Sequence, residues 1–156
     1  EVGSGISVRT AQKLEKLPLA GIEVAGVGGT SWAKVEAHRT PDAGQARAGH
    51  ALESWGTVTA ESVRITRRYH PEKTVIASGG IRGGQDIAKS IALGADIAAL
   101  ARPFLVAAQD GVESVRLAIS ELRRELQIVQ FVSGASTISG LRTEAILRDR
   151  FTGEEI

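Results

Sequence analysis

The amino-acid sequence predicts an α/β fold with parallel strands. Helical and strand patterns alternate along the chain, in the order helix, strand, helix, strand, helix, strand, helix. The chain has 156 residues, of which 42% are hydrophobic and 24% charged, so it can bury one sizeable core. Glycines gather where a strand pattern meets a helix pattern, most of all at residues 79–84. Such alternation implies right-handed crossovers between parallel strands.

The first half of the chain is predicted to hold two helices, one strand and a long loop. Ser7 is a helix N-cap followed by apolar residues at helical spacing, so we expect a helix over residues 7–17. The short apolar run 20–26 is closed by glycines and fits a buried strand. Residues 33–56 lack periodicity and contain a Pro-Asp turn, which indicates a long surface loop. A second helix is expected over residues 59–69.

The second half repeats the alternation. Residues 73–78 form a predicted strand that runs directly into the glycine cluster, and a helix follows over residues 85–93. The next predicted strand, 96–101, is broken by a proline. A long helix is expected over residues 112–129, where apolar residues recur at steps of three and four, and the tail 137–150 is expected to form one more short helix.

Two architectures satisfy this element order: a doubly wound sheet and part of a (β/α)8 barrel. A complete barrel usually needs about 250 residues, so a chain of 156 residues could hold about half of one. The first residue is Glu1, and the start of the chain reads as the end of a strand. We therefore expect the chain to begin inside a larger protein.

Composition excludes several classes of function. The chain has no cysteine, so a disulfide framework, a thiolate zinc site and a nucleophilic thiol are all impossible. The 19 Lys and Arg residues are balanced by 18 Asp and Glu residues, and aromatic residues make up 4%, so nucleic-acid binding is not expected. No apolar run approaches the roughly 18 residues of a membrane span. We expect a cytoplasmic protein that does not enter a membrane.

The glycine-rich turn at residues 79–84 predicts an anion site. It lies between a buried strand and a helix N-terminus, where backbone N–H groups and the helix dipole favour a phosphate. Its spacing is neither that of a Walker loop nor that of a dinucleotide-binding fingerprint. A second strand end, with Ala101 and Arg102, follows about twenty residues later. In barrel enzymes, the loops after the last two strands often build one shared phosphate site.

These motifs resemble those of FMN-binding (β/α)8 enzymes. The runs SGGIRGGQDIAK at residues 78–89, ALGAD at 92–96 and ARP at 101–103 are similar to the last two βα units of α-hydroxy-acid oxidases, IMP dehydrogenases and type 2 isopentenyl-diphosphate isomerases. IMP dehydrogenases use a nucleophilic Cys, which this chain lacks. Hydroxy-acid oxidases carry a His-Gly-Gly-Arg motif where residues 28–31 read Gly-Gly-Thr-Ser.

The earlier part of the chain most closely resembles the type 2 isomerases. Residues 1–7 look like the end of that family's fifth strand, and VAGVGGTSWAKVE at residues 24–36 resembles its sixth strand and loop. The resemblance covers almost the whole chain. It implies the carboxyl-terminal half of a (β/α)8 barrel, from the end of strand 5 through helix 8, as a single partial domain over residues 1–156.

The resemblance also implies a reaction and its cofactors. The family interconverts isopentenyl and dimethylallyl diphosphate with reduced FMN, while NADPH maintains the reduction and Mg²⁺ binds the diphosphate of this small-molecule substrate. Carried over residue by residue, the family's flavin site is formed here by Thr30, Gly79, Gly80, Arg82, Ala101 and Arg102. The family's flavin-contacting Lys, catalytic Gln and metal-binding Glu precede the first residue of this chain, so no catalytic or metal-binding residue is assigned.

A half barrel has open strand edges, which invite pairing. We therefore expect either a homo-oligomer or association with the missing N-terminal half. Two alternatives stay open: an FMN-dependent oxidoreductase of the hydroxy-acid oxidase type, and a non-catalytic phosphate-binding module.

Overall fold

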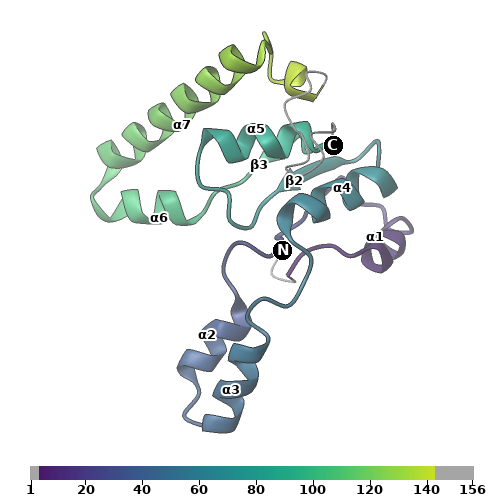
Figure 1. The fold of residues 1–156 in the computed structure, drawn as a ribbon, viewed down its shortest axis with the longest axis vertical. Helices are drawn as coiled ribbons and strands as arrows, with labels where there is room; N and C mark the ends of the chain where they lie inside the picture. The colour runs from purple at the N-terminus through teal and green to yellow at the C-terminus, as the bar shows by residue number, and fades with distance from the viewer. Residues whose placement is uncertain (1–3, 143–156) are drawn as a thin grey trace.

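The computed structural model describes residues 4–142. Helices separate the strands, with three of them between β1 and β2, and three short strands form one parallel sheet. The elements in chain order are α1 (Val8–Leu14), β1 (Gly21–Glu23), α2 (Trp32–Arg39), α3 (Ala43–Ala51), α4 (Thr59–Tyr69), β2 (Thr74–Ala77), α5 (Gly84–Ala92), β3 (Ile97–Ala98), α6 (Arg102–Gln109), α7 (Val112–Ser133) and the 3-10 helix η1 (Ser139–Arg142) (Figure 1).

The sheet has the strand order β1-β2-β3, which is also the chain order. Ile22 pairs with Val75, and Ala77 pairs with Ala98, so all three strands point the same way. The connection from β1 to β2 contains α2, α3 and α4, whereas α5 alone connects β2 to β3. Among the residues that the structure describes, neither outer edge of the sheet, on β1 or on β3, pairs with a further strand. The prediction of an α/β fold with parallel strands is confirmed.

Small apolar side chains form the core between the sheet and its helices. Val24, Val63, Val75, Ala77 and Ala95 make up one buried cluster, in which Val63 comes from α4 and packs against the sheet. A second cluster lies between α5, α7 and η1, and its buried members are Ala88, Ile91, Ala135 and Leu141. Helix α7 covers this second cluster with Leu126 and Val129. Helix α4 thus packs against the sheet, while α5 packs against α7 and η1.

The amino ends of β2 and β3 are joined by a network around Asp96. Its carboxylate accepts the Val75 N–H at 2.8 Å, Arg67 Nη2 at 2.5 Å and Arg142 Nη2 at 2.6 Å. Burial alone would raise the pKa of Asp96, but the Val75 N–H, Arg142 and Arg67 together hold that pKa below its ordinary value. Arg67 also donates to the carbonyls of Gly94, Pro71 and Lys73. This network fixes the sheet end opposite the glycine-rich turn.

The prediction of a long loop over residues 33–56 is wrong. That segment contains the two antiparallel helices α2 and α3, which form a hairpin that projects away from the sheet (Figure 1). Ser31 caps α2 by accepting the Lys34 N–H, and Asp42 caps α3 by accepting the Gln45 N–H. The Pro-Asp turn is the connection between the two helices. The hairpin was missed because neither helix has a broad apolar face, with Ala37 as its one buried residue across the two.

Several other boundaries differ from those predicted. Helix α6 is absent from the prediction, because a proline both ends a strand and suits the first turn of a helix, where α6 has it. The strand predicted over 96–101 is shorter, at Ile97–Ala98. Helix α1 ends at Leu14, before residue 17, and α7 continues to Ser133, past residue 129. Of the tail helix predicted over 137–150, the described part is η1, and residues 143–150 lie outside the described residues, as do residues 1–3 at the predicted end of strand 5.

No helix within residues 4–142 has the length and apolar character needed to cross a membrane.

Candidate functional site

The predicted site residues lie at the carboxyl edge of the sheet. Hydrogen bonds continue past the strand ends: Gly26 N donates to Ser78 O at 3.0 Å, and Ala99 N donates to Ala77 O at 2.8 Å. The segments that follow β1, β2 and β3 therefore leave the sheet from neighbouring positions at one edge. In open parallel α/β sheets this edge is where ligands bind.

Gly79 and Gly80 form a tight corner against the segment that follows β1. Their φ angles are +96° and +85°, a region that residues with a Cβ rarely adopt. A Cβ on Gly79 would fall on the carbonyl of Gly26, and a Cβ on Gly80 would fall on the carbonyl of Gly28. Thr59, at the start of α4, closes the corner by donating its hydroxyl to Gly79 O at 2.5 Å. Both glycines are thus required by close backbone packing.

Three main-chain donors at this corner have no acceptor within residues 4–142. The N–H groups of Gly79, Gly80 and Ile81 donate no hydrogen bond to any described residue, although Ile81 is buried. Buried backbone N–H groups are almost always paired in folded proteins. The unpaired donors are therefore suited to an anion such as a phosphate.

Helix α6 supplies a second set of donors at the same edge. It begins directly after β3, its N-cap is Ala101, and no side chain caps its first turn. The first N–H groups of a helix lack intrahelical partners and favour negative charge. Arg102, the first residue of α6, is exposed, and its side chain makes no hydrogen bond or ion pair with a described residue.

The N-terminus of α5, in contrast, already has carboxylate partners. Gly84 N donates to Glu125 Oε2 of α7 at 2.5 Å. The main-chain N and the Nε of Arg82 both donate to Asp86 Oδ2, at 3.2 and 3.0 Å. Asp86 raises the pKa of Arg82, whose side chain is 81% exposed and stays charged. An anion at this edge would therefore meet the Gly79–Ile81 backbone and α6 rather than the first turn of α5, which was expected to contribute.

The six predicted residues come from three loops at this one edge. Gly29 lies against the corner, since a Cβ there would be 3.0 Å from Gly79 Cα and 3.1 Å from Gly80 N, and exposed Thr30 follows it. Sequence reasoning missed Thr59 and Ile81 as parts of the corner. The sequence indicates Thr59 only as the start of a helix. The contact of its hydroxyl with Gly79 O depends on how α4 packs against the strand ends, which the spacing of residues in the sequence does not reveal.

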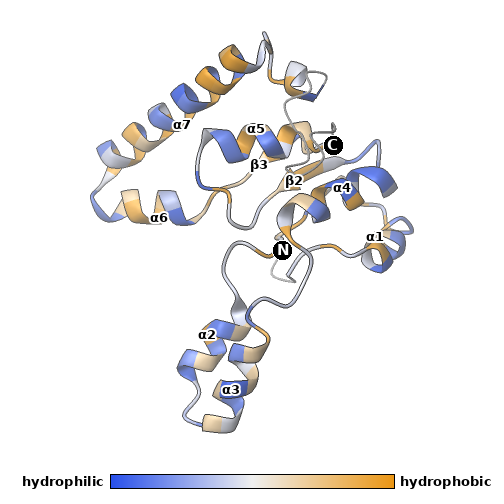
Figure 2. Cartoon of the chain, in the orientation of Figure 1, coloured by the Kyte–Doolittle hydropathy of each residue, from blue (hydrophilic) through white to orange (hydrophobic). Residues whose placement is uncertain are grey.

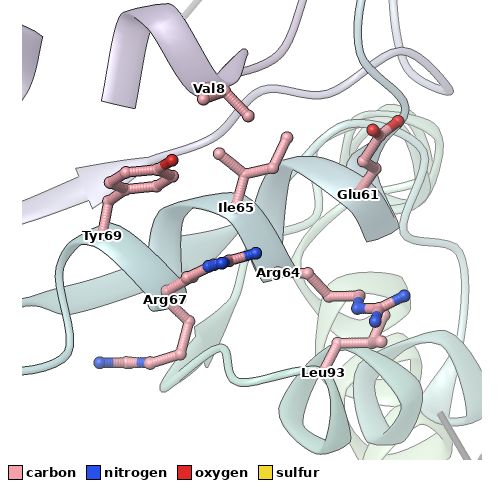
Figure 3. Close-up of a pocket in the computed structure, with 8 residues that line it drawn as sticks. Val8, Glu61, Arg64, Ile65, Arg67, Tyr69 and Leu93 are labelled. Atoms are coloured by element: carbon pink, nitrogen blue, oxygen red, sulfur yellow. The ribbon is translucent and has the colours of Figure 1, made fainter. Parts of the chain in front are cut away.

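A shallow groove elsewhere in the molecule does not include any of these six residues. It has a volume of about 500 Å³ and lies between α1, α4 and the end of α5, with Val8, Ile65, Tyr69 and Leu93 among the residues that line it (Figure 3). The residues that the structure describes contain no group of three or more acidic or histidine side chains placed to hold a metal ion.

Comparison with known proteins identifies close relatives of this chain. Isopentenyl-diphosphate delta-isomerases of Synechococcus sp., Nostoc sp. and Stutzerimonas stutzeri are 46%, 45% and 43% identical to it over 148 residues. Each match covers 95% of this chain but 42–43% of the relative, so the chain spans about two fifths of the length of these relatives. The resemblance inferred from the sequence motifs is confirmed.

Solved structures and a family model agree on the fold. A crystal structure of mandelate oxidase, 23% identical, covers 88% of this chain and 34% of that chain with a TM-score of 0.64. A second, with benzoyl-formic acid, is 21% identical and covers 89% of this chain and 36% of that chain with the same TM-score of 0.64. These likenesses concern the fold alone. The model of the FMN-dependent dehydrogenase family matches residues 6–148, and the chain therefore belongs to that family.

Proposed function

We propose that this chain is the carboxyl-terminal half of a (β/α)8 barrel that binds FMN and interconverts isopentenyl and dimethylallyl diphosphate. The observation that carries the proposal is the 46% identity to an isopentenyl-diphosphate delta-isomerase over 95% of the chain. Identity to mandelate oxidase, which shares the fold, is only 21–23%. The substrate class therefore follows the closer sequence relatives.

The half barrel is supported by the sheet. Three parallel strands lie in chain order, and neither β1 nor β3 has a partner on its outer side among the described residues. A closed barrel has eight strands and no edges, so further strands would have to lie between β3 and β1. The relatives are more than twice as long as the matched region, which leaves chain for those strands.

The corner at the carboxyl edge fits the phosphate of FMN. The unpaired N–H groups of Gly79 and Gly80, together with the first turn of α6 at Ala101 and Arg102, would donate to the phosphate oxygens. The exposed guanidinium of Arg82 would add positive charge, and Thr30 would contact the flavin. These groups would hold and orient FMN, and none of them is assigned a proton-transfer role.

FMN in its reduced form would supply the chemistry that moves the double bond, with NADPH keeping it reduced and Mg²⁺ binding the diphosphate. The residues described here bind the cofactor end of the site. The proton-transfer and metal-binding groups are proposed to belong to the rest of the barrel, and the whole protein is proposed to act in the cytoplasm.

An FMN-dependent oxidoreductase of the hydroxy-acid oxidase type is the second candidate. It is favoured by the family model and by the fold shared with mandelate oxidase. Against it stands the Gly-Gly-Thr-Ser sequence at residues 28–31, where a hydroxy-acid oxidase has His and Arg. A non-catalytic phosphate-binding module is the third candidate function.

Reconstitution of the barrel tests these candidates. The chain is co-expressed with the part of the Synechococcus relative that precedes the matched region, and the purified pair is assayed for flavin absorbance and for conversion of isopentenyl diphosphate. Both signals are expected. Oxidation of a 2-hydroxy acid would favour the oxidoreductase, binding of FMN without turnover would favour the module, and a colourless, inactive pair would reject the proposal.

A charge placed at the start of α6 locates the phosphate. Ala101→Asp puts a carboxylate at the N-cap, a position where Asp stabilises a helix, so α6 should remain intact. Repulsion of the phosphate should weaken FMN binding by about tenfold or more. Ala108→Asp is the matched control, because Ala108 is also exposed and lies near the other end of the same helix. Equal FMN affinity in both variants would place the phosphate elsewhere.

A further inference from the structure

Helix α7 has two apolar stripes on different sides. One stripe packs against α5 and η1 through Leu126 and Val129. The other contains Leu117, Ile128 and Phe131, which are 60%, 54% and 86% exposed. Figure 2 shows apolar and polar segments alternating along the whole length of α7, which lies at the edge of the molecule beyond α5. The second stripe has no cover within the described residues.

The exposed stripe follows a heptad pattern. Its positions advance by steps of three and four along α7, which is the spacing of a seam between two paired helices. In chain order the seam residues are Ser114, which is half-buried, and the exposed Leu117, Glu121, Arg124, Ile128 and Phe131. Glu121 and Arg124 are exposed and form no ion pair or hydrogen bond with another described side chain. The seam therefore has a charged centre with one carboxylate and one guanidinium.

This seam is complementary to itself in the antiparallel direction. With a two-fold axis between Leu122 and Arg123, Glu121 of one helix lies opposite Arg124 of the other. The same axis places Leu117 opposite Ile128, and the small Ser114 opposite the large Phe131. A single two-fold axis thus pairs opposite charges, apolar side chains, and a small with a large side chain. A parallel arrangement would instead place Glu121 opposite Glu121 and Arg124 opposite Arg124, which repels.

We propose that α7 pairs antiparallel with α7 of a second copy of this chain, through this seam. The interface is isologous, because the same residues are used on both sides, and it closes as a dimer. Each pair of opposed residues occurs twice in it. The proposal is independent of the reaction that the chain performs.

Charge exchange tests the register. Glu121→Arg alone and Arg124→Glu alone each place like charges opposite one another twice in the dimer, so each should weaken association by about tenfold or more. The double variant Glu121→Arg with Arg124→Glu restores the pairs with reversed sign and should recover association to within about threefold. Arg123→Glu is the matched control, because it makes the same change at the next residue, off the seam, and should leave association unchanged. Association is measured by sedimentation velocity over a range of protein concentrations.

Cross-linking gives an independent measure of direction. The chain has no cysteine, so an introduced thiol reacts without background. A mixture of Leu117→Cys and Ile128→Cys chains should cross-link with a short bis-maleimide, whereas Leu117→Cys alone should not, because its two thiols would lie about 16 Å apart along the helix axes. Circular dichroism of each variant verifies that α7 is formed.

Three outcomes would overturn the proposal. The first is a chain that stays monomeric at every concentration tested. The second is a double charge variant that associates no better than the single ones, which would mean that Glu121 and Arg124 do not face each other across the contact. The third is efficient cross-linking of Leu117→Cys with itself, which would mean a parallel pair.

Discussion

Substitution of Gly79 by alanine tests the backbone packing at the candidate phosphate site. Gly79 has a φ of +96°, and a Cβ at this position would collide with the carbonyl and lie 2.7 Å from the N of Gly26. Both of these atoms are main chain, so they cannot move aside as a flexible side chain would. Gly111 offers a matched control, because its φ is +97° and nothing lies within 4 Å of the position where its Cβ would be.

The expected free energies follow from these two environments. An alanine at positive φ costs about 1–3 kcal/mol relative to glycine, and both positions have a positive φ. The smaller conformational entropy of alanine in the unfolded chain stabilises both variants equally, by about 0.4–1 kcal/mol. Overpacking against fixed atoms adds about 1–3 kcal/mol, and it applies only to Gly79→Ala. The two variants should therefore differ by about 1–3 kcal/mol in the free energy of unfolding.

Urea unfolding followed by far-ultraviolet circular dichroism measures this difference, provided that the slopes of the two transitions agree. Gly79→Ala should have the lower midpoint. If the two variants were equal within about 0.5 kcal/mol, then Gly79 would not lie against Gly26, and the geometry of the whole corner would be wrong.

Three further substitutions have expected effects on the free energy of unfolding, each measured by urea titration. Thr66→Val should stabilise the protein by about 1 kcal/mol, because the Thr66 hydroxyl is buried without a hydrogen-bond partner; destabilisation would mean that the hydroxyl has a partner. In the same helix, Thr59→Val should destabilise by about 1–2 kcal/mol, because it leaves the Gly79 carbonyl without the hydroxyl donor. Asp96→Asn should destabilise by about 1–3 kcal/mol at pH 7, since Asp96 accepts the Val75 N–H and two guanidinium groups while remaining partly exposed. Because the folded-state pKa of Asp96 lies below its ordinary value, this contribution is complete above about pH 4 and lost as the pH falls through the folded-state pKa, so the gap between wild type and variant should close in acid.

The sequence predicted elements whose apolar residues recur over several turns. Helix α4 was expected over residues 59–69 and is found at Thr59–Tyr69, because Ser62, Val63 and Thr66 give it one buried face. Its start and its end at the His-Pro pair are local signals that tertiary contacts do not override. The strand before the glycine cluster, β2, was also predicted correctly, because a short apolar run next to a turn is typical of a buried strand.

The α2–α3 hairpin shows where this reasoning fails. Periodicity reports burial, and these helices bury little, so the pattern is absent although the helices form. A capping signal was present: Ser31 and Asp42 each accept an N–H three residues ahead. Reading caps without requiring an apolar face would have found both helices. The proline in the first turn of α6 was a second signal of the same kind.

The glycine corner was predictable in position, but the hydrogen bonds around it were not. Glycine spacing located the corner at Gly79 and Gly80, because backbone packing of this kind excludes a Cβ. The role of Glu125 could not be read from the sequence, since it comes from α7 and lies 41 residues further along the chain. Its carboxylate accepts the Gly84 N–H, so under the proposed function the first turn of α6, rather than that of α5, would face the phosphate.

Helix α7 has exposed apolar residues on two different sides. Val112, Ile119 and Leu126 recur every seven residues and so share one side of the helix. Leu126 packs against the α5 cluster, whereas Val112 and Ile119 are 69% and 52% exposed. This stripe is thus covered at one end only, and under the half-barrel proposal elements of the rest of the barrel would cover its other end. The stripe with Leu117 lies on a different side of α7, so closing the barrel and pairing two copies need not compete for the same residues.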